Sequence, residues 1–323
     1  MTTLYLTNGD AAAELLRATT LDGPVLPWRD ALHEGPIVAG ASLEGLSALR
    51  VAYLRRRFGL PDEALAVGFV DRDEVMHDHG AFDRIEIWLE HDLYDQLQLL
   101  QILDFFASVG RTEGVVLVQA DDFLTRQRPE TIGRFAARAR PLTAADLDLA
   151  QGVFADLGRS TPEHIVARLG TLGDALPFLD AALRRFVEEL PAPESGLGLT
   201  EARILESVGR GEATPRSLFR HVALGETAPF LGDWSFYRLL DDLAFCAVPL
   251  VEGLPHIYPT LETERDDYLL ADLFLSELGE AVLAGEEDHV AMSGLDRWWG
   301  GTRLDGHKVW RFDRETGALG APS

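Results

Sequence analysis

Apolar residues recur with two different spacings along the first 140 residues of the chain. A spacing of two, as in Leu4 and Leu6, predicts a strand, and a spacing of three or four, as in Leu93, Leu97 and Leu100, predicts a helix. These patterns predict strands at residues 4–6, 24–26, 85–89 and 115–118, and helices at 11–18, 43–58, 62–77 and 91–106. Strands that alternate with helices form βαβ units with parallel strands. Residues 1–140 are therefore predicted to form an α/β domain with an open, mostly parallel, Rossmann-like sheet.

The pattern changes after residue 140. Residues 141–190 have helical spacing and are predicted to form an extension packed on the first domain. Residues 191–198 are the predicted linker, because they begin with Pro-Ala-Pro-Glu-Ser-Gly, a stretch of two prolines and a glycine without apolar periodicity. Residues 199–323 hold three short predicted helices and end in strand-like runs around Asp305-Gly306, a dipeptide typical of tight hairpin turns. Helices followed by a terminal hairpin predict a winged-helix-like α+β domain over 199–323.

Composition narrows the class of protein. Hydrophobic residues make up 46% and charged residues 25% of the 323 residues, as in ordinary globular proteins. The formal net charge of -24 disfavours broad attraction to nucleic acids or anionic membranes. Cys246 is the only cysteine, which excludes a disulfide within the chain and a site built from several thiolates. Because we find no leader-like segment and no apolar run of about 18 residues, we expect a cytoplasmic protein with no membrane partner.

Polar clusters stand where three of the predicted strands end. They are Asn8-Gly9-Asp10, residues 30–34 (Asp-Ala-Leu-His-Glu), and Glu90-His91-Asp92 with Asp95-Gln96 just after. Ligands of open α/β sheets bind in the crevice beyond the carboxyl ends of the strands. The clusters therefore predict one shared pocket for a small polar ligand. The candidate ligand-binding residues are Asn8, Asp10, Arg29, Asp30, His33, Glu34, Asp92 and Gln96.

His91 and Asp95 are the candidate catalytic pair. They are four residues apart in the predicted helix 91–106, so their side chains are expected on one side of it. A carboxylate one turn away orients an imidazole and raises its basicity, as a general base requires. Alternatively, both side chains face a divalent metal ion, and His33 and Glu34 complete either arrangement.

The same residues have structural interpretations. Asp92 and Asp10 are well placed to cap the helices that follow them, and Asn8 suits a turn. In that case the clusters are only caps and turns, and the protein is a scaffold without a ligand.

A phosphate is a further candidate ligand. The N-terminus of the first helix favours anions, and Arg29 is the nearest planar cation. Arg29 can instead pair with Asp30 or Glu34. The string Asn8-Gly9-Asp10 matches neither a dinucleotide-binding nor a phosphate-loop motif, so an ordinary nucleotide site is not expected.

Several long strings resemble one known family. Asn8-Gly9-Asp10, residues 26–30 (Leu-Pro-Trp-Arg-Asp), residues 33–36 (His-Glu-Gly-Pro) and residues 88–100 (Trp-Leu-Glu-His-Asp-Leu-Tyr-Asp-Gln-Leu-Gln-Leu-Leu) resemble the bacterial domain-of-unknown-function family 1835. Residues 229–236 (Pro-Phe-Leu-Gly-Asp-Trp-Ser-Phe) and 296–304 (Asp-Arg-Trp-Trp-Gly-Gly-Thr-Arg-Leu) look like the C-terminal half of the same proteins. The resemblance implies an N-terminal α/β domain and a separate C-terminal helical module. It brings no catalytic residue with it.

Basic residues of the C-terminal domain raise the question of nucleic acid. The third predicted helix, at 234–245, is too acidic for a groove lined with phosphates. The terminal hairpin carries Arg297, Arg303, Lys308 and Arg311 among three tryptophans, which is typical of a surface that stacks bases. The alternative is that the tryptophans pack the hairpin onto helices while the basic residues balance acidic neighbours.

The sequence thus supports three hypotheses about function. In the first, the N-terminal domain binds a small polar ligand, either nucleotide-like or phosphorylated, and catalyses hydrolysis or group transfer, with a divalent metal as a possible cofactor. In the second, it senses a ligand, and the winged-helix-like module contacts nucleic acid or a transcription protein. In the third, the protein is a scaffold. The oligomeric state is left open.

Overall fold

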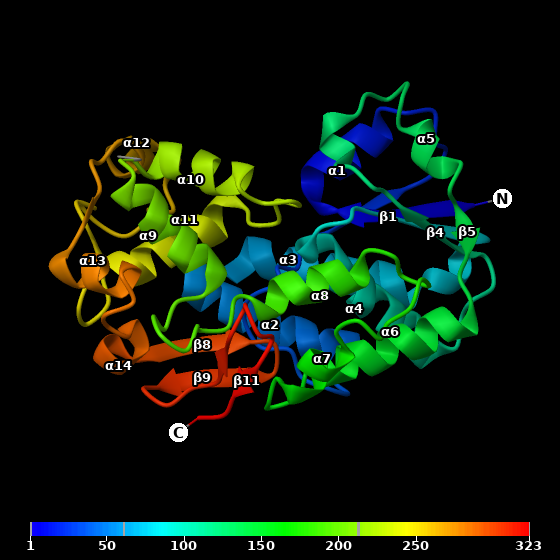
Figure 1. The fold of residues 1–323 in the computed structure, drawn as a ribbon. Helices are drawn as coiled ribbons and strands as arrows, with labels where there is room; N and C mark the ends of the chain where they lie inside the picture. Colours follow the sequence, from blue (N-terminus) through cyan, green and yellow to red (C-terminus); the bar gives the residue numbers. More distant parts are fainter. Residues whose placement is uncertain (1, 61, 212–213, 323) are drawn as a thin grey trace. The chain divides into compact units, whose positions relative to one another are not determined.

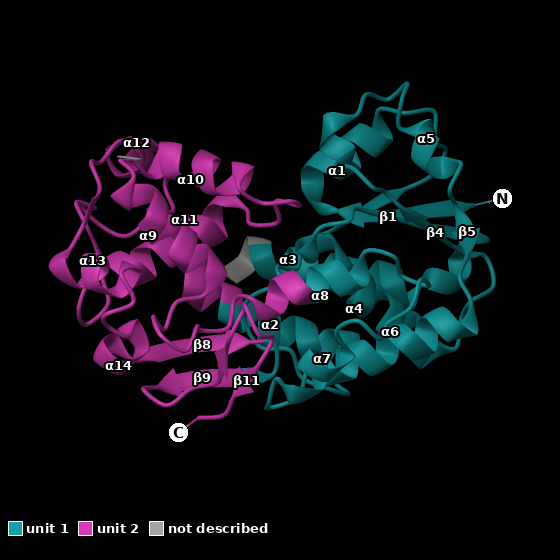
Figure 2. Cartoon of the chain, in the orientation of Figure 1, with its two compact units in different colours: residues 1–53, 61–183, 300–302 teal, residues 54–60, 184–299, 303–323 magenta. Residues whose placement is uncertain are grey.

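The computed structural model describes residues 2–60, 62–211 and 214–322. The chain forms two compact units (Figure 2). Unit 1 comprises residues 1–53, 61–183 and 300–302, and unit 2 comprises residues 54–60, 184–299 and 303–323. The main division therefore falls at residue 183, inside the predicted extension 141–190, and not at the predicted linker 191–198.

Unit 1 contains a five-stranded sheet in the order β2-β1-β3-β4-β5. Four strands are parallel: β1 (Thr3–Asn8), β2 (Val25–Trp28), β3 (Arg84–Leu89) and β4 (Val115–Gln119). The short β5 (Arg140–Pro141) pairs with β4 in the antiparallel direction. One row of paired residues, Leu26, Leu6, Ile87 and Leu117, crosses the four parallel strands. The predicted α/β class and the mostly parallel sheet are confirmed.

Helices cover both faces of this sheet (Figure 1). On one face, Tyr5, Trp88 and Val118 pack with helix α1 (Gly9–Arg17), the short η2 (Leu124–Arg126) and α5 (Gly133–Ala136). On the other face lie α4 (Leu93–Val109) and α6 (Ala144–Leu157). Unit 1 also contains most of α2 (Leu43–Phe58), α3 (Asp62–His77), η1 (His79–Ala81), α7 (Glu163–Arg168) and the first part of α8 (Leu179–Val187).

Residues 199–244 of unit 2 contain three helices, as the sequence predicts. They are α9 (Leu199–Gly209), α10 (Pro215–Leu224) and α11 (Asp233–Ala244), followed by η3 (Glu262–Glu264), α12 (Arg265–Leu269), α13 (Glu277–Leu283) and α14 (His289–Ser293). Its strands form three separate two-stranded sheets: β6 (Val251–Glu252) with β7 (Phe274–Leu275), β8 (Leu295–Trp299) with β9 (Thr302–Gly306), and β10 (Arg311–Phe312) with β11 (Leu319–Gly320). The winged-helix arrangement itself remains a prediction.

The predicted turn of the terminal hairpin is wrong. Asp305 and Gly306 lie in β9, and β8 joins β9 through Gly300 and Gly301. Gly300 has a φ of +56°, a conformation that costs glycine little, which explains the turn position. The rule that favours Asp-Gly turns was therefore overridden by a glycine pair five residues earlier in the chain.

The predicted linker 191–198 is a fixed loop of unit 2. The Ala192 N–H donates to the Leu197 carbonyl across the loop (3.0 Å), and the Phe312 N–H donates to the Pro191 carbonyl (2.9 Å). The Ser195 carbonyl accepts from the His289 N–H (2.9 Å). Proline and glycine mark irregular backbone correctly here, but hydrogen bonds from distant residues hold that backbone in place.

In the described residues, no helix combines the length and the apolar character that crossing a membrane requires.

Candidate functional site

The candidate site lies between β1 and β3, where the order in which strands are added to the sheet of unit 1 reverses. The chain runs from β1 to β2 on one side of β1, and β3 then pairs on the other side. Such a switch point leaves a crevice beyond the carboxyl ends of the two central strands. Asn8 ends β1, and Glu90 directly follows β3. The predicted location of a pocket therefore coincides with a feature of the sheet.

Three buried carboxylates, which we call the acidic cluster, gather at this switch point. Glu90, Asp92 and Asp95 each contribute an oxygen, and these oxygens lie within 4.8 Å of one another. At most 3% of each of these residues is exposed. Asp92 caps α4, because its Oδ1 accepts from the Asp95 N–H at 3.1 Å. The cap thus brings the two aspartates together, and Glu90 joins them from the end of β3.

Neighbouring groups hold the acidic cluster in place through their donors. The Asn8 side-chain amide donates to Asp95 Oδ1 at 2.6 Å, and the Leu124 N–H donates to Glu90 Oε1 at 2.7 Å. The Gln96 amide donates to the Glu90 carbonyl at 2.6 Å. With their NH2 groups used in this way, Asn8 Oδ1 and Gln96 Oε1 are buried and have no hydrogen-bond partner among the described residues. The surroundings of the cluster therefore offer spare acceptors.

Burial makes ionisation of the acidic cluster unfavourable. It raises the pKa of Glu90 to about 8 and that of Asp92 to about 7, and the Asp92 charge adds to the shift of Glu90. The pKa of Asp95 is also raised, by burial and then by the charges of Asp92 and Glu90. Like charges at close range in a medium of low polarity favour retained protons or a bound cation.

The acidic cluster differs from the other buried carboxylates in having no basic partner. Six buried carboxylates elsewhere in the described chain each pair with arginine: Asp30, Asp73, Asp146, Asp156, Glu201 and Asp241. Among the described residues, Glu90, Asp92 and Asp95 accept only from backbone N–H groups and the Asn8 amide. The counter-charge that this protein supplies at its other buried acids is missing here.

The predicted pairing of His91 with Asp95 is not found. Helix α4 begins at Leu93, so His91 lies before the helix and not on its surface. The imidazole packs between Phe123 and Phe178, with ring centroids 5.1 Å and 6.0 Å away. His91 Nδ1 is buried without a partner among the described residues, and burial lowers the pKa of His91. The cap at Asp92 moves the helix start by two residues, which removes the one-turn relationship.

Asp10 and Arg29 form an exposed pair beside the site. Arg29 donates to both carboxylate oxygens of Asp10, and the Nη2–Oδ1 distance is 2.6 Å. Asp10 lies in the first turn of α1, and Asn8 precedes that helix without capping it through its side chain. The predicted cap at Asp10 and the predicted ion pair of Arg29 with Asp30 or Glu34 are therefore wrong. Because β1 and β2 are neighbours, the first turn of α1, which follows β1 directly, meets the residue that follows β2.

Asp30 forms a buried ion pair that fixes the loop after β2. Arg50 Nε donates to Asp30 Oδ1 at 2.7 Å, and neither side chain is exposed. The same guanidinium donates to the carbonyls of Glu34 and Ala31. Arg50 was not predicted as a partner, and its place among polar and apolar residues of α2 carries no signal of one.

His33 contacts Tyr94 and Glu34 and is not part of the acidic cluster. Its ring lies 5.9 Å from the Tyr94 ring, and its Nε2 is 3.9 Å from Glu34 Oε1. Burial and the charges of Asp95 and Asp30 raise the pKa of Tyr94. The charges of the acidic cluster and of Asp30 therefore both disfavour ionisation of the Tyr94 hydroxyl.

The structure thus brings together only part of the predicted site. Asn8, Asp92, Asp95 and Gln96 meet around Glu90, which the sequence analysis placed in a cluster without giving it a role. Asp10, His33 and His91 have different neighbours: Arg29, Tyr94 and two phenylalanines, respectively.

The basic residues of the terminal segment are mostly neutralised. Four basic residues were candidates for contact with nucleic acid, and three of them pair with carboxylates: Arg297 with Glu201, Arg303 with Asp296, and Arg311 with Asp288. Trp299 is buried and stacks on Phe186 with a centroid distance of 4.3 Å. These contacts favour the alternative in which the tryptophans pack and the basic residues balance acidic neighbours.

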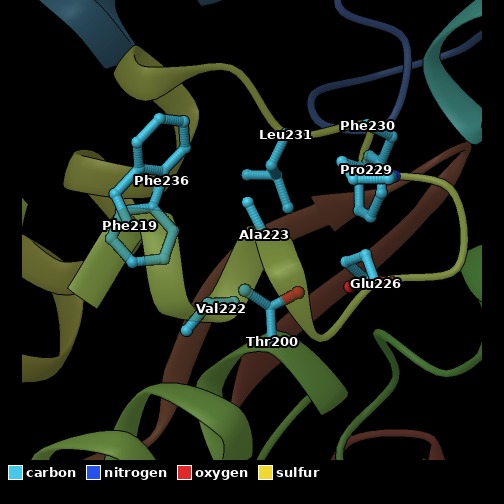
Figure 3. Close-up of a pocket in the computed structure, with 9 residues that line it drawn as sticks. All are labelled: Thr200, Phe219, Val222, Ala223, Glu226, Pro229, Phe230, Leu231 and Phe236. Atoms are coloured by element: carbon cyan, nitrogen blue, oxygen red, sulfur yellow. The ribbon is translucent and has the colours of Figure 1, made fainter. Parts of the chain in front are cut away.

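A small hollow in unit 2 is too tight for an organic ligand. Side chains of α9, α10, α11 and the loop before α11 surround it, among them Thr200, Phe219, Glu226 and Phe236 (Figure 3). Its internal volume of about 20 Å³ holds about one water molecule. Glu226, on its wall, already pairs with Arg185 and Arg203.

No protein-family model matches the chain, and no curated protein matches it. The resemblance to family 1835 therefore remains a prediction that depends on the strings quoted above.

Proposed function

We propose that unit 1 binds a divalent metal cation on Glu90, Asp92 and Asp95. Through this cation it binds a small phosphorylated or nucleotide-like ligand and catalyses hydrolysis or group transfer. The observation that carries the proposal is the missing counter-charge of the acidic cluster: three buried carboxylates meet with no basic side chain paired to them in the described part of the chain. A divalent cation supplies that charge.

The donor set supports a hard cation. The atoms available at the acidic cluster are carboxylate oxygens, with the amide oxygens of Asn8 and Gln96 beside them. Magnesium, manganese and calcium prefer oxygen ligands of this kind, whereas zinc and copper favour imidazole or thiolate. His91 packs between aromatic rings, and the single cysteine, Cys246, belongs to unit 2. Neither side chain is expected to be a ligand of the cation.

The position of the site supports a phosphorylated ligand. The acidic cluster alone repels an anion, but a dication held by the three carboxylates would offset most of their charge and would supply a Lewis acid for a phosphoryl oxygen. Asp10, the first carboxylate after β1 along the chain, pairs with Arg29, so its charge is already balanced. The N-terminus of α1 lies at the same edge of the sheet and favours anions. In this proposal His91 remains the base, and Asp95 binds the cation instead of orienting the imidazole.

The test is a titration of the full chain with Mg²⁺, Mn²⁺ or Ca²⁺ in a calorimeter, together with thermal unfolding at each cation concentration. We expect saturable binding of at least one cation, and a rise in Tm that Asp95→Asn and Glu90→Gln abolish. Asp156→Asn is the matched control, because this buried aspartate pairs with Arg159 and Arg168 and is expected to leave cation binding unchanged. Absence of binding at millimolar concentration and pH 8 would refute the proposal and favour the scaffold hypothesis.

A further inference from the structure

We infer that unit 2 carries a docking groove for a basic peptide segment that has an aliphatic side chain next to a lysine or arginine. The groove is open, and its volume of about 670 Å³ lies within the range of ligand sites in proteins. We call it the acidic groove. The residues that line it include Arg238, His256, Tyr258, Thr260, Glu264 and Asp267. This inference is independent of the proposed cation site, which lies in unit 1.

Buried hydrogen bonds hold the floor of the acidic groove. Asp241 accepts from the Tyr258 N–H at 2.9 Å, from the Tyr268 hydroxyl at 2.8 Å and from Arg238 at 3.0 Å. The Tyr258 ring packs on Tyr237 with a centroid distance of 4.5 Å. A floor held by three hydrogen bonds to one carboxylate and by packed rings is preformed, which lowers the entropy cost of binding.

The rim of the groove is acidic. Glu264 and Asp267 line it, and Glu262 directly precedes the lining residue Thr263. All three carboxylates are exposed and form no ion pair with the described residues. The basic side chains nearby are engaged: Arg238 with Asp241, and Arg265 with the Trp234 ring at 4.9 Å and with the Pro259 and Thr260 carbonyls. The charge at the rim is therefore negative, and it complements a cationic partner.

Exposed aliphatic side chains accompany these carboxylates. Ile257, which lines the groove, is 55% exposed, and Leu261, next to Thr260, is 60% exposed. Exposed apolar residues beside unpaired charges of one sign suit a segment that is itself both aliphatic and basic. A nucleic acid does not meet this description, because its backbone has the same sign of charge as the rim. A small polyamine lacks the aliphatic branch that Ile257 and Leu261 would contact.

The test measures fluorescence anisotropy of a labelled eight-residue peptide with three lysines and two leucines, titrated with the full chain at 150 mM salt. A second peptide carries serine in place of leucine, and spermine is added as a competitor. The groove variants are Glu264→Lys with Asp267→Lys, and Ile257→Ser. The matched control is Glu286→Lys with Glu287→Lys, which makes the same charge change on an exposed loop of the same unit. Thermal unfolding of each variant establishes that it is folded.

We expect the leucine peptide to bind, and the charge-reversed groove to weaken binding by about tenfold or more, while the control changes it by less than about twofold. Ile257→Ser and the serine peptide should each weaken binding by several-fold. Equal losses in the groove variant and the control would mean attraction to net charge alone and would overturn the inference. The inference also fails if wild type does not bind, if the serine peptide binds equally well, or if spermine at equal concentration displaces the peptide.

Discussion

The side-chain amide of Asn8 donates a hydrogen bond of 2.6 Å to the carboxylate of Asp95, 87 residues further along the chain. Asn8 ends β1 and Asp95 lies in the first turn of α4, so this bond spans the switch point of the sheet. It connects β1, the strand at which the strand order reverses, to α4, the helix that contains Asp95. The loss of this bond should therefore be felt both in stability and in cation binding.

Asn8→Ala is expected to lower the free energy of unfolding by about 1–3 kcal/mol, because a buried carboxylate loses its donor. Urea denaturation at pH 7 measures the change. The cation should recover part of the loss, since it replaces the missing donor, and Asn8→Asp should raise the stabilisation by the cation above that of wild type. If Asn8→Ala is as stable as wild type with and without cation, the bond has no role in the site.

The stability of the cation-free protein should depend on pH through the acidic cluster. The pKa values of Glu90 and Asp92 are raised to about 8 and about 7, so the folded state binds more protons than the unfolded state between about pH 4 and pH 8. The contribution is therefore absent below this window and becomes increasingly unfavourable as the pH rises through it.

We expect the Tm without cation to fall between pH 5 and pH 8, and Glu90→Gln to flatten this decline and to raise the Tm at pH 8. Saturating cation should flatten it as well, because the bound charge replaces the protons. Scans in a chelator and in 10 mM cation give the comparison. A Tm that is independent of pH without cation would contradict the raised pKa values.

The buried pair of Asp30 and Arg50 should be costly to break. Asp30→Asn leaves a buried guanidinium without its carboxylate, for which we expect a loss of about 3–5 kcal/mol in urea denaturation. Asp10→Asn is the control, since it breaks an exposed pair with Arg29 and should cost no more than about 1 kcal/mol. Equal losses in the two variants would mean that the loop after β2 is not held by Arg50.

His91→Ala should separate the histidine from the acidic cluster. The imidazole packs between two phenylalanines and is not a partner of Asp95, so we expect a folded protein whose cation affinity stays within about threefold of wild type. Hydrolysis of a panel of phosphorylated compounds by wild type should disappear in this variant. A large loss of cation affinity would instead make His91 a ligand of the metal.

The sequence predicted the sheet well because its signals are local. Apolar strands alternating with helices predicted the mostly parallel sheet, and the polar residues after β1 and β3 predicted a site at the edge where the acidic cluster lies. The roles within the site were less predictable. Asp95 was assigned to His91 from helical spacing, but a cap at Asp92 moved the start of the helix and a donor from β1 took the carboxylate.

Features that depend on distant contacts escaped the sequence analysis. The residues at 191–198 have the composition of a linker, yet Phe312 and His289 fix their backbone. The partner of Asp30 is Arg50 in α2, and the partner of Arg29 is Asp10 in α1. Which charges meet is decided by tertiary packing, and spacing along one segment does not contain that information.

The path of the chain through its two units has a practical consequence for protein production. Residues 300–302 belong to unit 1, where the Gly300 carbonyl accepts from the Ile37 N–H and the Gly301 N–H donates to the Leu157 carbonyl. A truncated fragment that ends near residue 190 would lose both bonds. The Ile37 N–H would then lack its acceptor, and the Leu157 carbonyl would lack its donor. Because each unit consists of several chain segments, no single cleavage releases either unit intact. The full-length polypeptide is therefore the appropriate material for every measurement proposed above.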